Sequence, residues 1–164
     1  MSKRAVILVG MAAGLIWSVA LVSWAIAPAS AFEGQGLAEG LSLAGFLAGS
    51  PLLLMIGRLA QRRFFDDSII DGQPYAEGSA AQIDQRVLTN TTEQLVLAAA
   101  IWPMASVLSH PGAAIWLALG FLVTRLLFWV GYHLSPPLRG FGFAASFYPT
   151  LVVALWVIWS LLKG

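Results

Sequence analysis

Cysteine is absent from the 164 residues of the chain. The absence excludes disulfide bonds, thiolate metal sites and a cysteine nucleophile supplied by the protein itself. Charged residues are also scarce, at 10% against roughly 25% in soluble proteins, and the net charge of +1 gives no reason to expect a nucleic-acid partner. Hydrophobic residues reach 59% and mean hydropathy is +0.80. The composition therefore predicts a single domain dissolved in a lipid bilayer.

Five apolar runs of helical length, with few charged residues, follow one another along the chain. A transmembrane helix needs about 20 apolar residues, and the five runs cover residues 5–27, 40–57 with a start near Leu37, 84–108, 113–134 and 140–162. The sequence predicts an all-α membrane protein, a four-helix transmembrane bundle with an extra N-terminal transmembrane helix. Residues 1–36 form that helix and an outer linker, and residues 37–164 form the four-helix domain.

The first apolar run has two interpretations. Lys3 and Arg4 precede it and Ala29-Ser30-Ala31 follows it, a pattern typical of a cleaved signal peptide. The run of 23 residues is nevertheless longer than the roughly 7–15 residues of a signal-peptide core. We favour a retained helix, and in either case four helices remain.

The positive charges predict the orientation of the helices. With the N-terminus inside, only Lys163 lies at the outer end and Arg125 lies within the membrane. The other basic residues fall at or near the cytoplasmic face: Lys3, Arg4, Arg58, Arg62, Arg63, Arg86 and Arg139. The longest polar segment, residues 62–85, falls on the same side, so polar chemistry is expected there.

Charged residues inside two predicted helices form the main candidate site. Arg86, Asn90 and Glu93 follow i, i+4, i+7 spacing and share one helix face, as Arg125 and Tyr132 do on the next helix. Glu93 and Arg125 each lie about nine residues, or about 13 Å, from the inner ends of antiparallel neighbouring helices. Charges in a bilayer are costly unless they are paired. The two residues either form a bridge that locks the helices together or bind a polar ligand.

Three motifs on consecutive predicted helices resemble those of a known family. Residues 86–93, RVLTNTTE, are similar to an R-x-x-x-N-x-x-E signature. Residues 124–132 resemble the following helix of that family, in which arginine and tyrosine stand seven apart, and Pro137-Leu138-Arg139 resembles the loop whose arginine opens the last helix. Over residues 37–162 the chain thus resembles bacterial-type members of the MAPEG family, membrane-associated proteins in eicosanoid and glutathione metabolism.

The resemblance implies a homotrimer in the bacterial inner membrane. Glutathione would be its co-substrate, bound between subunits on the cytoplasmic side, and the other partners would be membrane lipids and a lipophilic small molecule. Arg139 would lie beside the thiol, and Arg62 or Arg63 would hold a glutathione carboxylate. The remaining implied contacts with glutathione are those of Arg86, Asn90, Glu93, Arg125 and Tyr132.

The implied activity is a glutathione-dependent transferase or peroxidase acting on lipophilic electrophiles. A thiol has a pKa near 8.5, and a neighbouring guanidinium favours its thiolate form. Arg139 is the expected activating residue, with Arg125 as its competitor. Leu88, Gln94 and Phe128 replace polar or tyrosine residues of the leukotriene-forming branch. The apolar replacements, Leu88 and Phe128, favour the alternative of a non-catalytic lipid-binding or scaffold protein on the same fold. A transporter or an assembly factor is a third, less favoured class.

Neither a metal nor a haem is expected. His110 and His133 lie about 35 Å apart on one helix, too far for a single haem. Asp66, Asp67 and Asp71 are most simply the solvated surface of the polar loop.

Glycines spaced for close helix contact occur twice. Gly10 and Gly14 form a GxxxG pattern, and so do Gly45 and Gly49. Such pairs let two helix backbones approach each other, and either pair is a candidate for a helix–helix contact.

Overall fold

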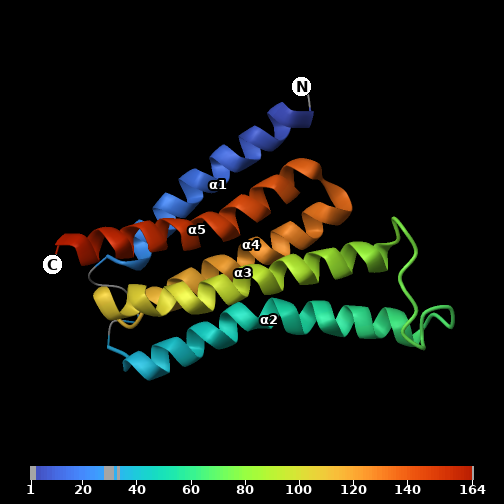
Figure 1. Ribbon diagram of the computed structural model, residues 1–164, viewed down its shortest axis with the longest axis horizontal. Helices are drawn as coiled ribbons and strands as arrows, with labels where there is room; N and C mark the ends of the chain where they lie inside the picture. Colours follow the sequence, from blue (N-terminus) through green and yellow to red (C-terminus); the bar gives the residue numbers. More distant parts are fainter. Residues whose placement is uncertain (1–2, 28–31, 33, 164) are drawn as a thin grey trace.

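The computed structural model describes residues 3–27, 32 and 34–163 of the chain. Over these residues it contains five helices (Figure 1): α1 (Lys3–Ala25), α2 (Leu37–Phe64), α3 (Ala80–Leu108), α4 (Ala113–Leu134) and α5 (Pro136–Lys163). Each is long and apolar enough to cross a membrane. The predicted all-helical membrane fold is confirmed, while the candidate cleavage pattern at residues 29–31 lies outside the described residues.

α2, α3 and α5 each extend by four or more residues beyond the runs from which they were predicted. α2 continues through Arg62 and Arg63 to Phe64. α3 begins at Ala80, because the hydroxyl of Ser79 caps its first turn by accepting the Gln82 N–H at 3.1 Å. α5 begins at Pro136, since proline fits the first turn, where its missing N–H costs nothing. Hydrophobicity therefore predicts the apolar middle of these three helices but not their polar ends.

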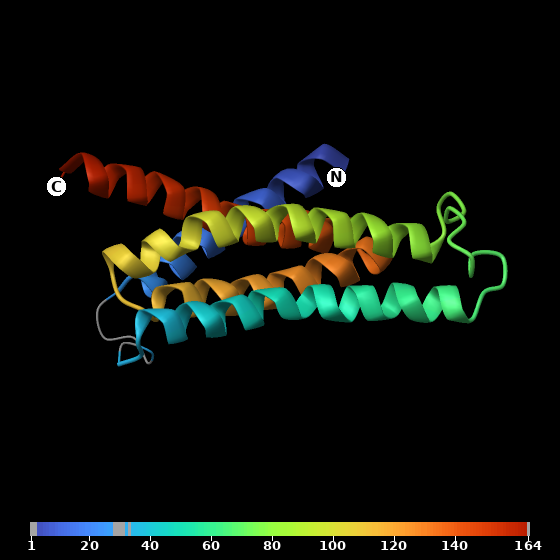
Figure 2. The same ribbon diagram turned by 60° about the horizontal axis from the view of Figure 1, so that its bottom comes forward.

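α4 is the central helix of the bundle, in contact with all four others. α2 packs against α3 and α4, and α5 packs against α3, α4 and α1. Figure 2 shows α1 on the α5 side of the bundle, away from α2. The start of α1, the α2–α3 loop and the α4–α5 turn lie at one end of the molecule, on the right in Figure 1. We call it the loop end, and it is the end predicted to face the cytoplasm.

The first glycine pair brings α1 onto α5. A Cβ atom at Gly10 would lie 3.0 Å from the Phe141 amide nitrogen, and one at Gly14 would lie 2.9 Å from that of Ala145. These distances are too short for a side chain, so the backbones touch because both residues are glycine. The pair at residues 45 and 49 has no such neighbour within 4 Å in the described chain.

The apolar core fills the half of the bundle away from the loop end. Its large members are Trp102 from α3, Phe121 from α4 and Val153 from α5, packed among small residues such as Ala98 and Ala118. A second, smaller cluster of Met55, Val87 and Phe128 lies toward the loop end. Buried polar side chains are concentrated around this smaller cluster, which therefore borders the candidate site.

Candidate functional site

Arg125 is the centre of a buried polar network. Its side chain is 0% exposed, and its Nε and Nη2 donate to the Thr91 hydroxyl at 3.1 and 2.8 Å. Nη2 also donates to Asn90 Oδ1 at 3.0 Å, and Nη1 donates to the Ser146 hydroxyl at 3.0 Å. The guanidinium stands 3.9 Å from the centre of the Phe128 ring, close enough for a cation–π contact. One arginine thus ties α3, α4 and α5 together.

The predicted pairing of Glu93 with Arg125 is wrong. Arg125 is surrounded by neutral oxygens, and Glu93 is exposed on the outer side of α3. The two residues match in depth, but Glu93 lies about 200° around the helix from Thr91, the residue that faces Arg125. The buried charge is therefore balanced by hydrogen bonds and a ring rather than by an acid.

A cavity of about 280 Å³ lies next to this network, at the loop end of the bundle. Its polar lining comes from Asn90, Tyr132 and Arg139, three of the residues predicted for the site. The apolar lining is Ile7, Met11, Pro136, Gly140, Phe128 and Phe143. Asn90 belongs to both features, because its side-chain oxygen accepts from Arg125. The structure thus brings Asn90, Tyr132 and Arg139 together and places Arg125 directly behind them.

Arg139 owes its position to a close approach of α5 to α4. A Cβ atom at Gly131 would lie 2.8 Å from both Arg139 Cα and the Leu138 carbonyl carbon, so only glycine fits there. The Arg139 N–H donates to the Ser135 carbonyl at 3.0 Å in the first turn of α5, and its guanidinium stands 5.0 Å from the centre of the Tyr132 ring. The charge therefore sits in the first turn of a helix, whose partial positive end adds to it.

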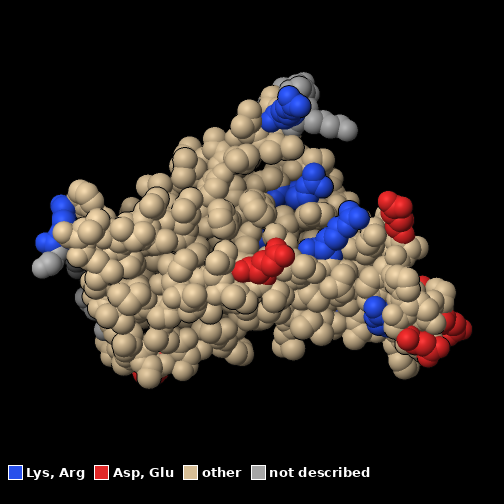
Figure 3. All heavy atoms as spheres, in the orientation of Figure 1, with Lys and Arg blue, Asp and Glu red and all other residues tan. Residues whose placement is uncertain are grey.

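Arg86 and Glu93 lie outside this cavity, on the exposed surface of α3. Glu93 lines an open groove along α3 with Thr89, Thr92 and apolar neighbours. In Figure 3 cationic groups lie next to an acidic group on the face where α3 and α5 run. The surface around them is almost free of charge, so this part of α3 exposes a cation and an anion in otherwise uncharged surroundings.

Arg62 and Arg63, at the end of α2, make their contacts with α3 and with the α2–α3 loop. Arg62 Nε donates to Asp84 Oδ2 at 2.7 Å. Arg63 donates to the carbonyls of Ile69 and Gln73 at 3.0 and 3.3 Å, and it stacks on Tyr75. Neither arginine lines the Arg139 cavity. Their predicted contact with a glutathione carboxylate stays a prediction, and within one chain it does not share a cavity with the other site residues.

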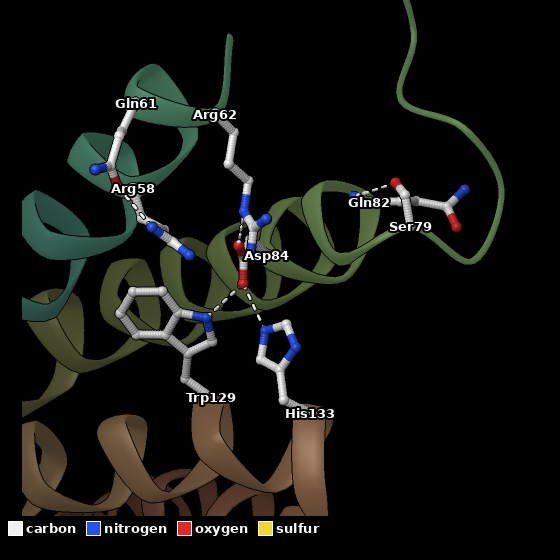
Figure 4. Close-up of polar contacts among 8 residues, drawn as sticks. All are labelled: Arg58, Gln61, Arg62, Ser79, Gln82, Asp84, Trp129 and His133. Carbon is white, nitrogen blue, oxygen red and sulfur yellow. Dashed lines mark hydrogen bonds and ion pairs between the residues drawn. The ribbon is translucent and has the colours of Figure 1, made fainter. Parts of the chain in front are cut away.

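Asp84 was missed by the sequence analysis and joins three helices (Figure 4). It is 1% exposed, and besides Arg62 it accepts from Trp129 Nε1 at 2.6 Å and contacts His133 Nε2 at 2.7 Å. A cavity of about 430 Å³ with Arg58 at its edge adjoins this cluster. Two features of the sequence could have indicated this cluster. One is an acid at the predicted start of a helix, and the other is a Trp-x-x-x-His pair near the end of the next helix. Nothing in the sequence indicated that Thr91, Ser146 and Gly131 take part in the site, because their contacts depend on how the helices pack.

The fold and these contacts define a class: a helical integral membrane protein with a buried arginine network beside a small, partly apolar cavity. Comparison with known families then identifies the family. The MAPEG family model matches residues 5–159, and the chain belongs to this family. The matched range includes α1, whereas the three motifs lie in α3, α4 and the start of α5. Membership assigns the chain to a membrane family of glutathione-related transferase and peroxidase type. Neither the curated proteins nor the solved structures give a match.

Proposed function

We propose that the protein is a membrane-embedded transferase or peroxidase that activates glutathione against lipophilic electrophiles. The observation that carries this proposal is Arg139, a cation in the first turn of α5 that faces a cavity with an otherwise neutral lining. An anion is the natural ligand of such a place. Because the chain belongs to the MAPEG family, we take the thiolate of glutathione to be this anion.

The residues around the cavity have different proposed roles. Arg139 stabilises the thiolate by its charge and by the helix end on which it sits. Tyr132 supports the guanidinium with its ring and has a hydroxyl that can hydrogen-bond the ligand. Asn90 is held in one orientation by Arg125, which leaves its amide group fixed at the cavity wall. Arg125 is therefore a positioning residue.

The chemistry balances without a further cofactor. In transfer to an aryl halide, the thiolate sulfur forms a C–S bond, the carbon–halogen bond breaks, and halide leaves with the electron pair. The thiol proton goes to solvent. In the peroxidase reaction the thiolate attacks one peroxide oxygen, the O–O bond breaks to release an alcohol, and a second glutathione completes the disulfide with loss of water.

The peptide part of glutathione carries carboxylates and an ammonium group, and the cavity lining offers a single charged residue, Arg139. Arg86 and Glu93 on the exposed face of α3 suit its carboxylate and ammonium groups. A site that combines this face with the Arg139 cavity is best completed by a neighbouring subunit, in keeping with the homotrimer that the family resemblance implies. The loop end carries most of the positive residues and would lie in the cytoplasm, with the protein in a bacterial inner membrane.

A non-catalytic lipid-binding or scaffold protein is the second candidate. The observation that favours it is the groove of about 650 Å³ on α3, whose lining includes Leu88, Val96 and Leu97. Such a surface accepts an acyl chain as readily as a protein partner. The two functions differ in whether glutathione is consumed.

Glutathione binding followed by turnover separates the candidates. Isothermal titration calorimetry in detergent should detect glutathione binding, and a generic aryl halide should then be conjugated. Arg139→Ala should bind glutathione and lose conjugation, while Arg4→Ala, an exposed arginine at the start of α1, should behave as the wild type. Binding without turnover in the wild type would favour the scaffold function, and no binding would exclude the transferase.

A further inference from the structure

The Arg139 cavity has a chemically mixed lining. Asn90, Tyr132 and Arg139 supply its polar groups, and Ile7 and Met11 add apolar side chains from α1. Both α1 residues are 38% exposed, so their side chains stand at the rim rather than in the core. A lining that combines a few polar groups with apolar side chains is expected where a charged nucleophile meets an apolar acceptor.

α1 is held firmly enough to form a defined wall. Gly10 and Gly14 place its backbone against the first turns of α5, next to the Pro136–Gly140 segment that carries Arg139. Ile7, Met11 and Gly14 follow i, i+4, i+7 spacing and share the face that meets α5. The same glycine contact that packs α1 therefore fixes the distance between its apolar side chains and Arg139.

We infer that α1 forms the acceptor subsite, in which Ile7 and Met11 bind the apolar part of a compact electrophile. This inference rests on the proposed function and adds to it the substrate class. Pockets for drug-sized ligands measure about 300–1,000 Å³, and this cavity measures about 280 Å³. The space beside Arg139 suits one aromatic ring or a short alkyl chain, with α1 limiting access for bulky acceptors. A chain without α1 would lose this selection.

The absence of cysteine allows a direct test with single-cysteine variants. Ile7→Cys places a thiol in the proposed subsite, and Leu8→Cys places one at the neighbouring position, which is 63% exposed and does not line the cavity. Full-length protein in detergent is labelled with N-ethylmaleimide. The added ligands are two glutathione thioethers, S-hexylglutathione, which has an apolar tail, and S-methylglutathione, which lacks one. Calorimetry measures the binding of both ligands separately.

S-hexylglutathione at ten times its dissociation constant should slow labelling of Ile7→Cys about tenfold, the ratio set by site occupancy. S-methylglutathione should protect it much less, and Leu8→Cys should react at the same rate throughout. Met11→Cys is a second reporter with the same expected pattern. Binding of both thioethers without protection of Ile7→Cys, or equal protection by both, would overturn the subsite and leave the proposed function intact. Failure of both thioethers to bind would overturn the proposed function itself.

Discussion

Thr91→Val tests whether neutral hydrogen bonds hold the buried charge of Arg125. The two side chains have nearly the same shape, so the change creates no cavity, and Thr91 is 0% exposed. It removes the hydroxyl that accepts from both Nε and Nη2 of Arg125. Nη2 keeps Asn90, but Nε has no other acceptor among the contacts described for it. The variant therefore leaves part of a buried guanidinium without a partner.

The expected loss can be bounded. A hydrogen bond to a charged group is worth about 1.5–3 kcal/mol, and two are affected, one of which is partly replaced. We expect Thr91→Val to lower the free energy of unfolding by about 3 kcal/mol. An ordinary neutral hydrogen bond between membrane helices averages about 0.6 kcal/mol, so the charge decides the size of the effect. Thr92→Val is the control, because Thr92 is exposed and bonds only the Leu88 carbonyl.

Reversible unfolding in mixed detergent micelles, followed by circular dichroism, gives both free energies. The same substitution in an Arg125→Met background closes a double-mutant cycle. We expect Thr91 and Arg125 to be coupled by about 2 kcal/mol, with Thr92→Val within about 0.5 kcal/mol of the wild type. A coupling energy no larger than the neutral value of about 0.6 kcal/mol would refute the assignment of Thr91 as a main partner of the charge.

Three further predictions concern the loop end. Arg139→Ala should keep most glutathione affinity and lose turnover, and the pKa of the bound thiol should rise. Thiolate absorbance titrated against pH would detect the shift, and an unchanged titration would contradict the role of Arg139. Gly131→Ala should push Arg139 away from α4. We expect kcat to fall by at least about tenfold, while glutathione binding measured by calorimetry changes little. A normal kcat would show that the close contact between Gly131 and Arg139 is not needed. Asp84→Asn should cost about 2 kcal/mol in detergent unfolding, because Asp84 serves Arg62, Trp129 and His133 at once; a loss below about 0.5 kcal/mol would mean that these partners find water instead.

The helices could be predicted from the sequence because the bilayer sets their length. α4 begins and ends at the predicted residues, as the break at residues 109–112 required. The starts of α3 and α5 were placed four residues too late, because Ser79 and Pro136 act through capping and backbone geometry rather than hydrophobicity. Of the helix contacts, the sequence predicted only that α3 and α4 are neighbours, and the first glycine pair identified one contacting face of α1.

The candidate site was predictable in residue type and depth but not in direction. The spacing of charged residues correctly placed Arg125 inside the bundle, and Asn90, Tyr132 and Arg139 share a cavity in the structure. The spacing of charged residues could not show which way Glu93 points. The rotation of α3 is set by the packing of Thr91 and Val87 against the neighbouring helices. Hydrogen-bonding serines and threonines have no pattern of their own, so their part in the site appears only in three dimensions.

The pairing of α1 with α5 has a consequence for how the chain is made. α1 leaves the ribosome before α5 and packs mainly against it, although about 110 residues separate Ala25 from Pro136. At about 5–20 residues per second, translation leaves α1 waiting on the order of 5–20 s for its partner. During that time the faces of Gly10 and Gly14 meet lipid or the insertion machinery instead of α5. The arginine cavity is therefore enclosed only after the start of α5 has been made, and any partner that engages α1 earlier would have to release it before the site can form.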